Sequence, residues 1–448
     1  MEKQATQGLT RHLVEQGLRR SLPGLPDDVR RVGLDCLIDW LGCSFAALDE
    51  PAGRIVAEVA REEGGHAQAT LLGRRWRGSL QQAALVNGTT SHALDYDDVN
   101  LSVPGHMSAA IFPALVALAE YRDVRVADLL VAFAAGYEFA CSMGKLVEPA
   151  HYANGFHATA TIGCLAAAMA CARLLALPVE QACHAVGVAA TQAAGLKVMF
   201  GSMAKPLHAG LASQSGLRAV LLAGKGFTSR MDALECPQGF VQVHGADFHA
   251  DQALSAPRGG FHLLNNLFKF HAACYSTHST IEAVVALRRE HALAAQSVAR
   301  IDVVAGEGCS ICNLQQPGTA LEAKFSLRAT AAFAMLGIDT SDLGTWGRVS
   351  DPEVRALMER VRVELVPEMG LSEATVAIVQ DDGRRLVKSH DCGTPMADKA
   401  EQSKRVAAKF RAIAAPALGS GGVGQVLDIL GGRSLDGRVA ELMSCCRG

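Results

Sequence analysis

The stretch from Ala158 to Leu177, ATATIGCLAAAMACARLLAL, is the most apolar part of the chain. Its length would suit a membrane span, but it is rich in alanine, contains threonine and cysteine, and carries Arg173. Alanine is the strongest helix former, and an arginine within a membrane span is costly. The stretch therefore predicts a helix that is buried in the core of a globular protein.

Helical periodicity extends on both sides of this stretch. Apolar residues recur at three- and four-residue steps in Val29 to Phe45 and in Asp128 to Gly136, and Pro and Gly separate such runs. Hydrophobic residues make up 49% of the chain but aromatic residues only 5%. Because a core of Ala, Leu and Val suits close-packed helices better than a β-sandwich, we predict a mainly α-helical protein.

The periodicity changes in the last third of the chain. β-Branched residues alternate or cluster in Arg300 to Val304 and in Val361 to Val366, and Asp381-Asp382-Gly383 is a hairpin-turn signal. A chain of 448 residues also exceeds the size at which one hydrophobic core usually stops growing. We predict a smaller, lid-like α+β domain inserted into a large all-helical domain, with residues 268–396 in the former and residues 1–267 and 397–448 in the latter.

The charge balance disfavours several classes of partner. The 42 basic and 45 acidic residues give a net charge of -3, which is too weak to attract nucleic acid or an anionic membrane. The N-terminal segment carries charges where a secretory signal has an apolar stretch. We therefore expect a cytoplasmic protein with a small-molecule ligand.

The cysteines and glycines do not predict a cofactor. The 13 cysteines are scattered and many lie in apolar helical patterns, which indicates buried thiols in a reducing compartment. Cys309 and Cys312 have metal or redox spacing, but no second such pair completes a tetrahedral site. The run from Gly419 to Gly424 matches G-x-G-x-x-G but follows no strand, so we expect a flexible turn there. The sequence thus predicts neither a metal nor an organic cofactor.

Polar side chains gather at two points among small and apolar residues. Asp95, Asp97 and Asp98 lie within four residues, so some of them must face solvent or meet cations; a polar helix end with a capping Asp is the alternative. Lys205 lies among Met, Ala, Pro and Leu. A partly desolvated lysine can act as a base or pair with a carboxylate, although a lysine that snorkels at the surface remains the alternative.

Two further segments carry ionisable groups beside apolar residues. Tyr152, Asn154 and His157 precede the predicted buried helix, whose free N–H groups would suit a substrate carboxylate; they could instead cap the helix. Lys269 and His278 lie near the predicted domain junction, where pockets tend to form.

In this order, these segments resemble the MmgE/PrpD family, which includes 2-methylcitrate dehydratases, cis-aconitate decarboxylases and iminodisuccinate epimerases. The resemblance covers nearly the whole chain and is carried by NGTTSHALDYDD (87–98), KPLHAGLASQSGLRAVLLAGKGFTS (205–229), KFHAACYSTHSTIEA (269–283) and EAKFSLRATAA (322–332). It implies a large all-helical domain, a smaller α+β domain, a homodimer, and an active site between the domains without metal or organic cofactor.

The resemblance also implies which residues act. We predict that Lys205 transfers a proton and that Tyr152 or His157 is its counterpart across the substrate. Asp95 is expected to orient His106 or Lys205 by charge-assisted hydrogen bonding. The remaining predicted residues bind substrate carboxylates: Lys269, His208 and His278, with His106 also in reach of such a group.

All reactions named for this family can begin with proton transfer at a carbon next to a carboxylate. Two positions depart from the decarboxylase pattern, because Val99 stands where Thr is common and Ala329 replaces a Tyr. We therefore predict an isomerase that epimerises an iminodisuccinate-like dicarboxylate. The alternative is a lyase, either a dehydratase of 2-methylcitrate-like substrates or a cis-aconitate decarboxylase. A polycarboxylate-binding protein without activity is the non-enzyme alternative.

Overall fold

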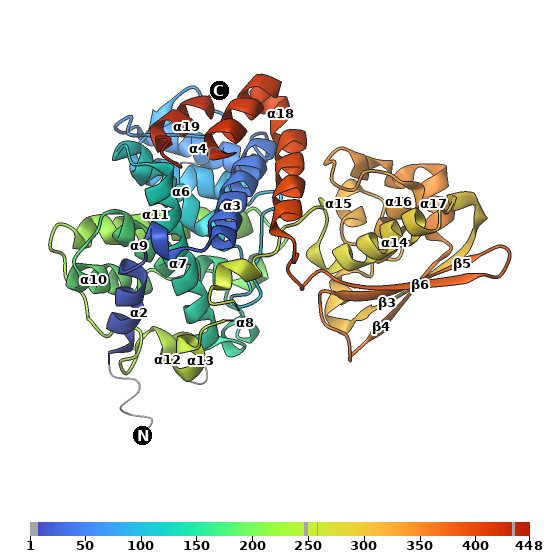
Figure 1. Ribbon diagram of the computed structural model, residues 1–448, viewed down its shortest axis with the longest axis horizontal. Helices are drawn as coiled ribbons and strands as arrows, with labels where there is room; N and C mark the ends of the chain where they lie inside the picture. The colour runs from blue at the N-terminus through green and yellow to red at the C-terminus, as the bar shows by residue number, and fades with distance from the viewer. Residues whose placement is uncertain (1–7, 246–249, 258, 432–434) are drawn as a thin grey trace. The chain divides into compact units, whose positions relative to one another are not determined.

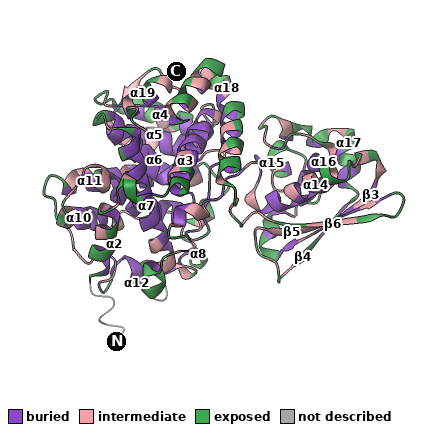
Figure 2. Cartoon of the chain, viewed as in Figure 1, coloured by how far each residue is buried: buried purple, intermediate pink, exposed green. Residues whose placement is uncertain are grey.

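The alanine-rich stretch forms helix α9 (Ala158–Leu174), in which every residue from Ala158 to Ala172 is buried. It packs against the helices α6 (Met107–Tyr121), α7 (Val126–Val147), α10 (Val179–Ala190) and α11 (Ala204–Ala223). Figure 2 shows the buried interior of these helices. The predicted buried helix is confirmed, and it lies at the core because its small side chains let neighbouring helices approach closely.

The computed structural model describes residues 8–245, 250–257, 259–431 and 435–448. The chain divides into two units, Met1–Phe268 with Ala397–Gly448, and Lys269–Met396 (Figure 1). The predicted mainly α-helical fold with a smaller α+β part is confirmed. The first unit also contains α2 (Leu9–Leu18), α3 (Asp27–Ala46), α4 (Pro51–Glu63), β1 (Ala69–Thr70), β2 (Arg77–Gly78), α5 (Leu80–Ser91), α8 (Ala150–Ala153), α12 (Phe240–His244), α13 (Ala250–Leu254), α18 (Lys399–Gly431) and α19 (Val439–Cys445).

Two described helices are long and apolar enough to cross a membrane by length and composition, α7 and α18. The apolar window of α7 is 89% buried inside the protein, as in the core helix of a soluble protein. Helix α18 packs on α3 and continues through the glycine run, where only Gly419 leaves the helical conformation (φ 66°). The predicted turn is therefore confined to the kink at Gly419, where two helical segments meet, and the rest of the run is helical. Val423 and Val426 are buried after the kink, so packing keeps this glycine-rich segment helical.

The second unit contains a four-stranded sheet with the order β4-β3-β5-β6. Strand β3 (Val298–Gly306) pairs parallel with β4 (Val361–Val366) and antiparallel with β5 (Glu373–Gln380). Strands β5 and β6 (Arg385–Asp391) form a hairpin whose turn includes Gly383 (φ 86°), as the sequence predicted. The helices of this unit, which lie on one side of the sheet in Figure 1, are α14 (His278–Glu290), α15 (Ala320–Ala323), α16 (Leu327–Leu336) and α17 (Pro352–Met358).

Candidate active site

The end of α5 and the N-termini of three helices carry the polar residues of the first unit. Helix α5 begins at a capping box between Ser79 and Gln82 and is followed by His92. The chain then loops to His106, the residue that precedes α6. His157 precedes α9, and Lys205 lies in the first turn of α11. The backbone N–H groups and positive dipole ends of these helices favour anions.

Glycines allow these elements to meet. A Cβ atom at Gly88 of α5 would lie 2.7 Å from the Cα of Gly210 in α11, so these helices could not cross this closely with larger residues. A Cβ atom at Gly105 would lie 3.0 Å from the backbone nitrogen of Thr159, and the His106 amide donates to the Thr159 hydroxyl (3.0 Å). The chemistry-bearing ends of α5, α6, α9 and α11 are therefore held together by backbone packing.

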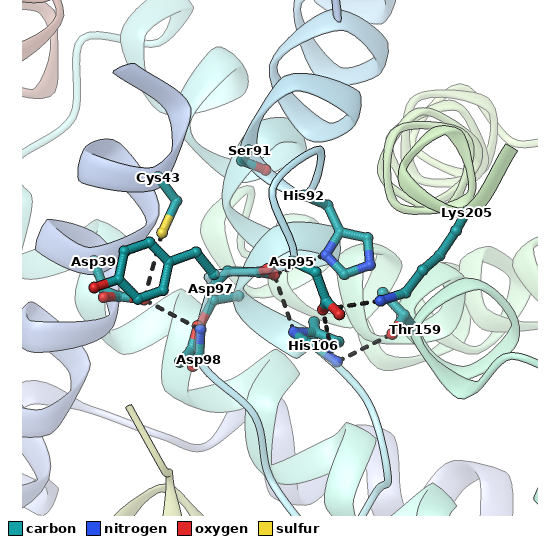
Figure 3. A network of polar contacts seen from close by, with 12 residues as sticks. Asp39, Cys43, Ser91, His92, Asp95, Asp97, Asp98, His106, Thr159 and Lys205 are labelled. Carbon is teal, nitrogen blue, oxygen red and sulfur yellow. Dashed lines mark hydrogen bonds and ion pairs between the residues drawn. The ribbon is translucent and has the colours of Figure 1, made fainter. Parts of the chain in front are cut away.

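Lys205, Asp95 and His106 form a continuous polar chain (Figure 3). The Lys205 ammonium lies 2.8 Å from Asp95 Oδ1, and the same oxygen lies 3.3 Å from His106 Nε2. Asp95 has a positive φ of 52°, a conformation that Asp tolerates better than most residues. The Lys205 side chain is 14% exposed and that of Asp95 is 39% exposed, so the pair is accessible from one side. The predicted pairing of Asp95 with Lys205 and His106 thus has a geometric basis.

A second carboxylate, that of Asp97, contacts the rings of His92 and His106. Both oxygens of Asp97 lie 3.0 Å from His92 Nδ1, and Asp97 Oδ2 lies 3.2 Å from His106 Nδ1. Asp97 and His92 are fully buried. The His106 ring thus has a carboxylate oxygen within 3.3 Å of each nitrogen.

His157 and His208 form the opposite part of the cluster. Their Nδ1 atoms lie 3.0 Å apart, so one ring donates and the other accepts. The ring of Phe200 lies 5.0 Å from the His157 ring and 5.2 Å from the Lys205 ammonium. His157 also stacks on His92 at 6.1 Å between ring centroids. The site therefore combines one lysine, two carboxylates and several imidazoles in one largely buried place.

The surroundings lower the pKa values of three groups in this cluster. Burial, followed by the charges of His92 and Lys205, lowers the pKa of His157 far below its ordinary value, so its imidazole is neutral. Burial lowers the pKa of His92 to about 4 in spite of Asp97. Burial alone would raise the pKa of Asp97, but His106 and His92 hold it well below the ordinary value. Strongly shifted pKa values gathered at one place are typical of a functional site.

The neutral histidines predict acid sensitivity. A histidine whose folded pKa is depressed contributes stability that is present above about pH 6.5 and lost as the pH falls, because the unfolded chain then binds the extra proton. Between pH 7.5 and 5.5 each such histidine is expected to cost about 1.4 kcal/mol. Urea unfolding at both pH values should show a smaller loss for His157→Gln than for the natural protein, with His12→Gln, on the surface, as control. Equal losses in all three proteins would contradict the assignment.

A buried ion pair holds the loop that carries Asp95 and Asp97. Lys409 of α18 donates to Asp39 Oδ1 and to the Tyr96 carbonyl, each at 2.7 Å, and Asp39 Oδ2 accepts from the Asp98 amide at 3.1 Å. Burial alone would lower the pKa of Lys409, but Asp39 raises it, so Lys409 is charged. The backbone is thus fixed on both sides of Asp97.

A metal ion is not needed to explain the cluster. One donor atom from each of His92, Asp95, Asp97 and His106 lies within 4.8 Å of the others, so spacing alone would permit a cation. In the described residues, however, the Lys205 ammonium contacts Asp95, and Asp97 binds the His92 ring. The Lys205 ammonium offsets the charge of Asp95, and the Asp97 carboxylate already has an imidazole partner. The predicted absence of a metal stays a prediction.

The other predicted residues lie in different surroundings. The Lys197 ammonium lies 3.4 Å from the centre of the Tyr152 ring and donates to the Tyr152 carbonyl (2.8 Å), so the role of Tyr152 opposite Lys205 stays a prediction. Lys269 and His278 belong to the second unit and are buried there. The His278 ring lies 5.0 Å from that of His271. The predicted contact of Lys269 and His278 with substrate also stays a prediction.

Four of the residues described above were not assigned a role by the sequence. His92 and Asp97 lie inside the NGTTSHALDYDD motif, so the clustering of ionisable residues was a signal for them. Asp39 and Lys409 lie 370 residues apart in apolar helical patterns. An isolated charge in such a pattern is a weak signal for a buried ion pair, and its partner is defined only by the tertiary structure.

Comparisons with known proteins match both parts of the chain to one family. The MmgE/PrpD N-terminal domain matches residues 19–253, and the MmgE/PrpD C-terminal domain matches residues 271–427. A human protein named cis-aconitate decarboxylase is 26% identical over 417 residues, which cover 88% of this chain and 85% of that protein. A mouse protein of the same name is 27% identical over 390 residues, which cover 82% of this chain and 78% of that protein.

A relative from Aspergillus oryzae, cis-aconitate decarboxylase-like protein oryM, is 28% identical over 283 residues. That alignment covers 60% of this chain and spans only 59% of the relative's length. The first domain match alone covers more than half of the chain, and the second covers most of the remainder. The sequence-based resemblance is confirmed, and the chain belongs to the MmgE/PrpD family.

Proposed function

We propose that this protein is a lyase that decarboxylates a small unsaturated tricarboxylate, and that cis-aconitate is the first substrate to test. The proposal depends on one observation: Lys205, Asp95 and His106 form a chain of polar contacts where the N-termini of α6, α9 and α11 lie together. Cations and helix N-termini of this kind suit a substrate with several carboxylates. The human, mouse and fungal relatives are named for this substrate class.

The expected reaction moves two electron pairs and one proton. The bond between a carboxylate and the carbon beside the alkene breaks, and its electron pair forms a new carbon–carbon double bond. The pair of the original double bond takes a proton at the alkene carbon next to a second carboxylate. Carbon dioxide leaves, and the product is a dicarboxylate with a terminal alkene.

The chain's own residues can supply what this reaction needs. Lys205, held by Asp95, is placed to deliver the proton, and the adjacent His106 can replenish it along the chain of contacts. Charge that develops on the substrate carboxylates is met by Lys205 and by the helix N-termini in a largely buried site. The neutral His157, whose ring lies 5.0 Å from that of Phe200, offers a hydrogen-bonding or proton-accepting nitrogen.

The epimerase predicted from the sequence gains no support from these relatives, which favour the lyase alternative. The prediction was based on Val99 and Ala329. Val99 contributes its backbone to a bridge with Leu267. Ala329 is fully buried within α16 of the second unit. Both residues have packing roles of their own, so they are weak evidence for a change of chemistry.

Product analysis in heavy water tests the proposal. With cis-aconitate, NMR should show release of carbon dioxide and one deuterium in the methylene group of the new dicarboxylate. A 2-methylcitrate substrate that instead forms an ultraviolet-absorbing alkene would indicate a dehydratase. Exchange of a carbon-bound hydrogen in iminodisuccinate without a new alkene would indicate the epimerase. Binding of these compounds without any turnover would indicate a polycarboxylate-binding protein.

A further inference from the structure

The Asp97 carboxylate occupies an unusual position in the site. It is fully buried, it does not belong to the Lys205–Asp95–His106 chain, and it contacts two imidazoles at once. The contact with His92 Nδ1 has hydrogen-bond distances to both carboxylate oxygens, whereas His106 Nδ1 lies 3.2 Å from Asp97 Oδ2 as an ion-pair contact and has no hydrogen bond among the described residues. A buried carboxylate without a substrate-facing role needs such donors to be stable.

We propose that Asp97 is a positioning residue: its carboxylate accepts the Nδ1–H group of His92, faces Nδ1 of His106 at 3.2 Å, and so turns the Nε2 atom of each ring toward the Asp95–Lys205 pair. His106 Nε2 lies 3.3 Å from Asp95 Oδ1. In the part of the chain that the structure describes, His92 Nε2 is buried without a hydrogen-bond partner. Figure 3 shows Asp97 on one side of both rings and Lys205 on the other.

The surroundings of Asp97 support this role. Tyr96 and Asp98, its neighbours in the chain, are held through their backbone by Lys409 and Asp39. The rings of His92 and His106 lie 4.5 Å apart, so a single carboxylate can reach both. A fixed acceptor at Nδ1 leaves Nε2 as the only atom through which either ring can exchange a proton with the accessible pair.

The tautomers of the two histidines test the inference directly. In the natural protein labelled with ¹⁵N-histidine, NMR should show a proton on Nδ1 of both rings, with resonances assigned through His92→Gln and His106→Gln. In Asp97→Asn, whichever way the amide is turned, its NH₂ group replaces one of the two oxygens that lie 3.0 Å from His92 Nδ1. Because that group can only donate, the His92 ring is expected to move its proton from Nδ1 to Nε2. This readout needs no substrate, so it remains informative if cis-aconitate is not turned over.

The kinetic part of the test rests on the proposed function. With cis-aconitate, Asp97→Asn should lower kcat about 100-fold or more and leave KM within about threefold, as expected for a residue that orients a proton-transfer histidine without touching substrate. Asp98→Asn is the matched comparison, because Asp98 is equally buried but accepts from Ser108 at 2.8 Å and contacts neither ring; its loss of kcat should be at least tenfold smaller.

Two results would overturn the inference. One is a natural protein in which His92 carries its proton on Nε2, which can be seen even if Asp97→Asn does not fold. The other is an Asp97→Asn protein that is folded and keeps kcat within a few-fold of the natural value. If neither protein acts on cis-aconitate but the tautomers change as expected, the proposed substrate fails and the positioning role stands.

Discussion

Replacing Lys205 by alanine is expected to reduce turnover by about 1,000-fold or more while the protein stays folded. The ammonium lies 2.8 Å from Asp95 Oδ1, and the Lys205 side chain is 14% exposed, so it can meet a substrate. Its removal takes away both the proton donor and a positive charge beside the substrate carboxylates. Steady-state kinetics with cis-aconitate, or with whichever polycarboxylate is turned over, measures the effect.

Two further variants make this test specific. Lys404→Ala removes an exposed lysine of α18 and should retain natural activity. Lys205→Arg keeps the charge but replaces a compact ammonium by a planar group that does not release its proton, so it should recover substrate binding more than kcat. Activity of Lys205→Ala within a few-fold of the natural protein, with an unchanged circular dichroism spectrum, would end the assignment of Lys205 to proton transfer.

The largest loss of stability is expected from Lys409→Met. The change leaves the Asp39 carboxylate fully buried beside Asp97 and Asp98 with no cation, and removal of one partner of a buried ion pair typically costs about 3–5 kcal/mol. It also removes the donor to the Tyr96 carbonyl, so the loop that carries Asp95 should loosen and turnover should fall. Urea unfolding at pH 7.5 measures the change in the free energy of unfolding.

The same helix offers the matched control. Lys404→Met makes the same change at a side chain that is 75% exposed and should alter stability by less than about 0.5 kcal/mol. Adding Asp39→Asn to Lys409→Met removes the uncompensated charge and should restore part of the lost stability. A Lys409→Met protein that loses less than about 1 kcal/mol would show that the pair does not anchor the loop.

Local sequence signals predicted the elements of this fold well. The alanine-rich stretch is helix α9, the alternating residues from Arg300 lie in β3, and Asp382-Gly383 lies in the hairpin turn between β5 and β6. These elements follow from side-chain periodicity and turn chemistry, which act over a few residues. The exception is the run from Gly419 to Gly424, because packing after the kink overrides the low helix propensity of glycine.

The sequence by itself determined the helical class, the family, and the segments from which the acid/base residues come, since each of these depends on short motifs and their order. Only the tertiary structure decided which of these residues meet. Asp97 is buried and contacts His92 instead of facing solvent. Lys409 of α18 donates to the Tyr96 carbonyl, although the two residues are more than 300 positions apart in the sequence. Such contacts depend on the close crossing of α5 and α11 at Gly88 and on burial of paired charges, and neither property is encoded in any single stretch of the chain.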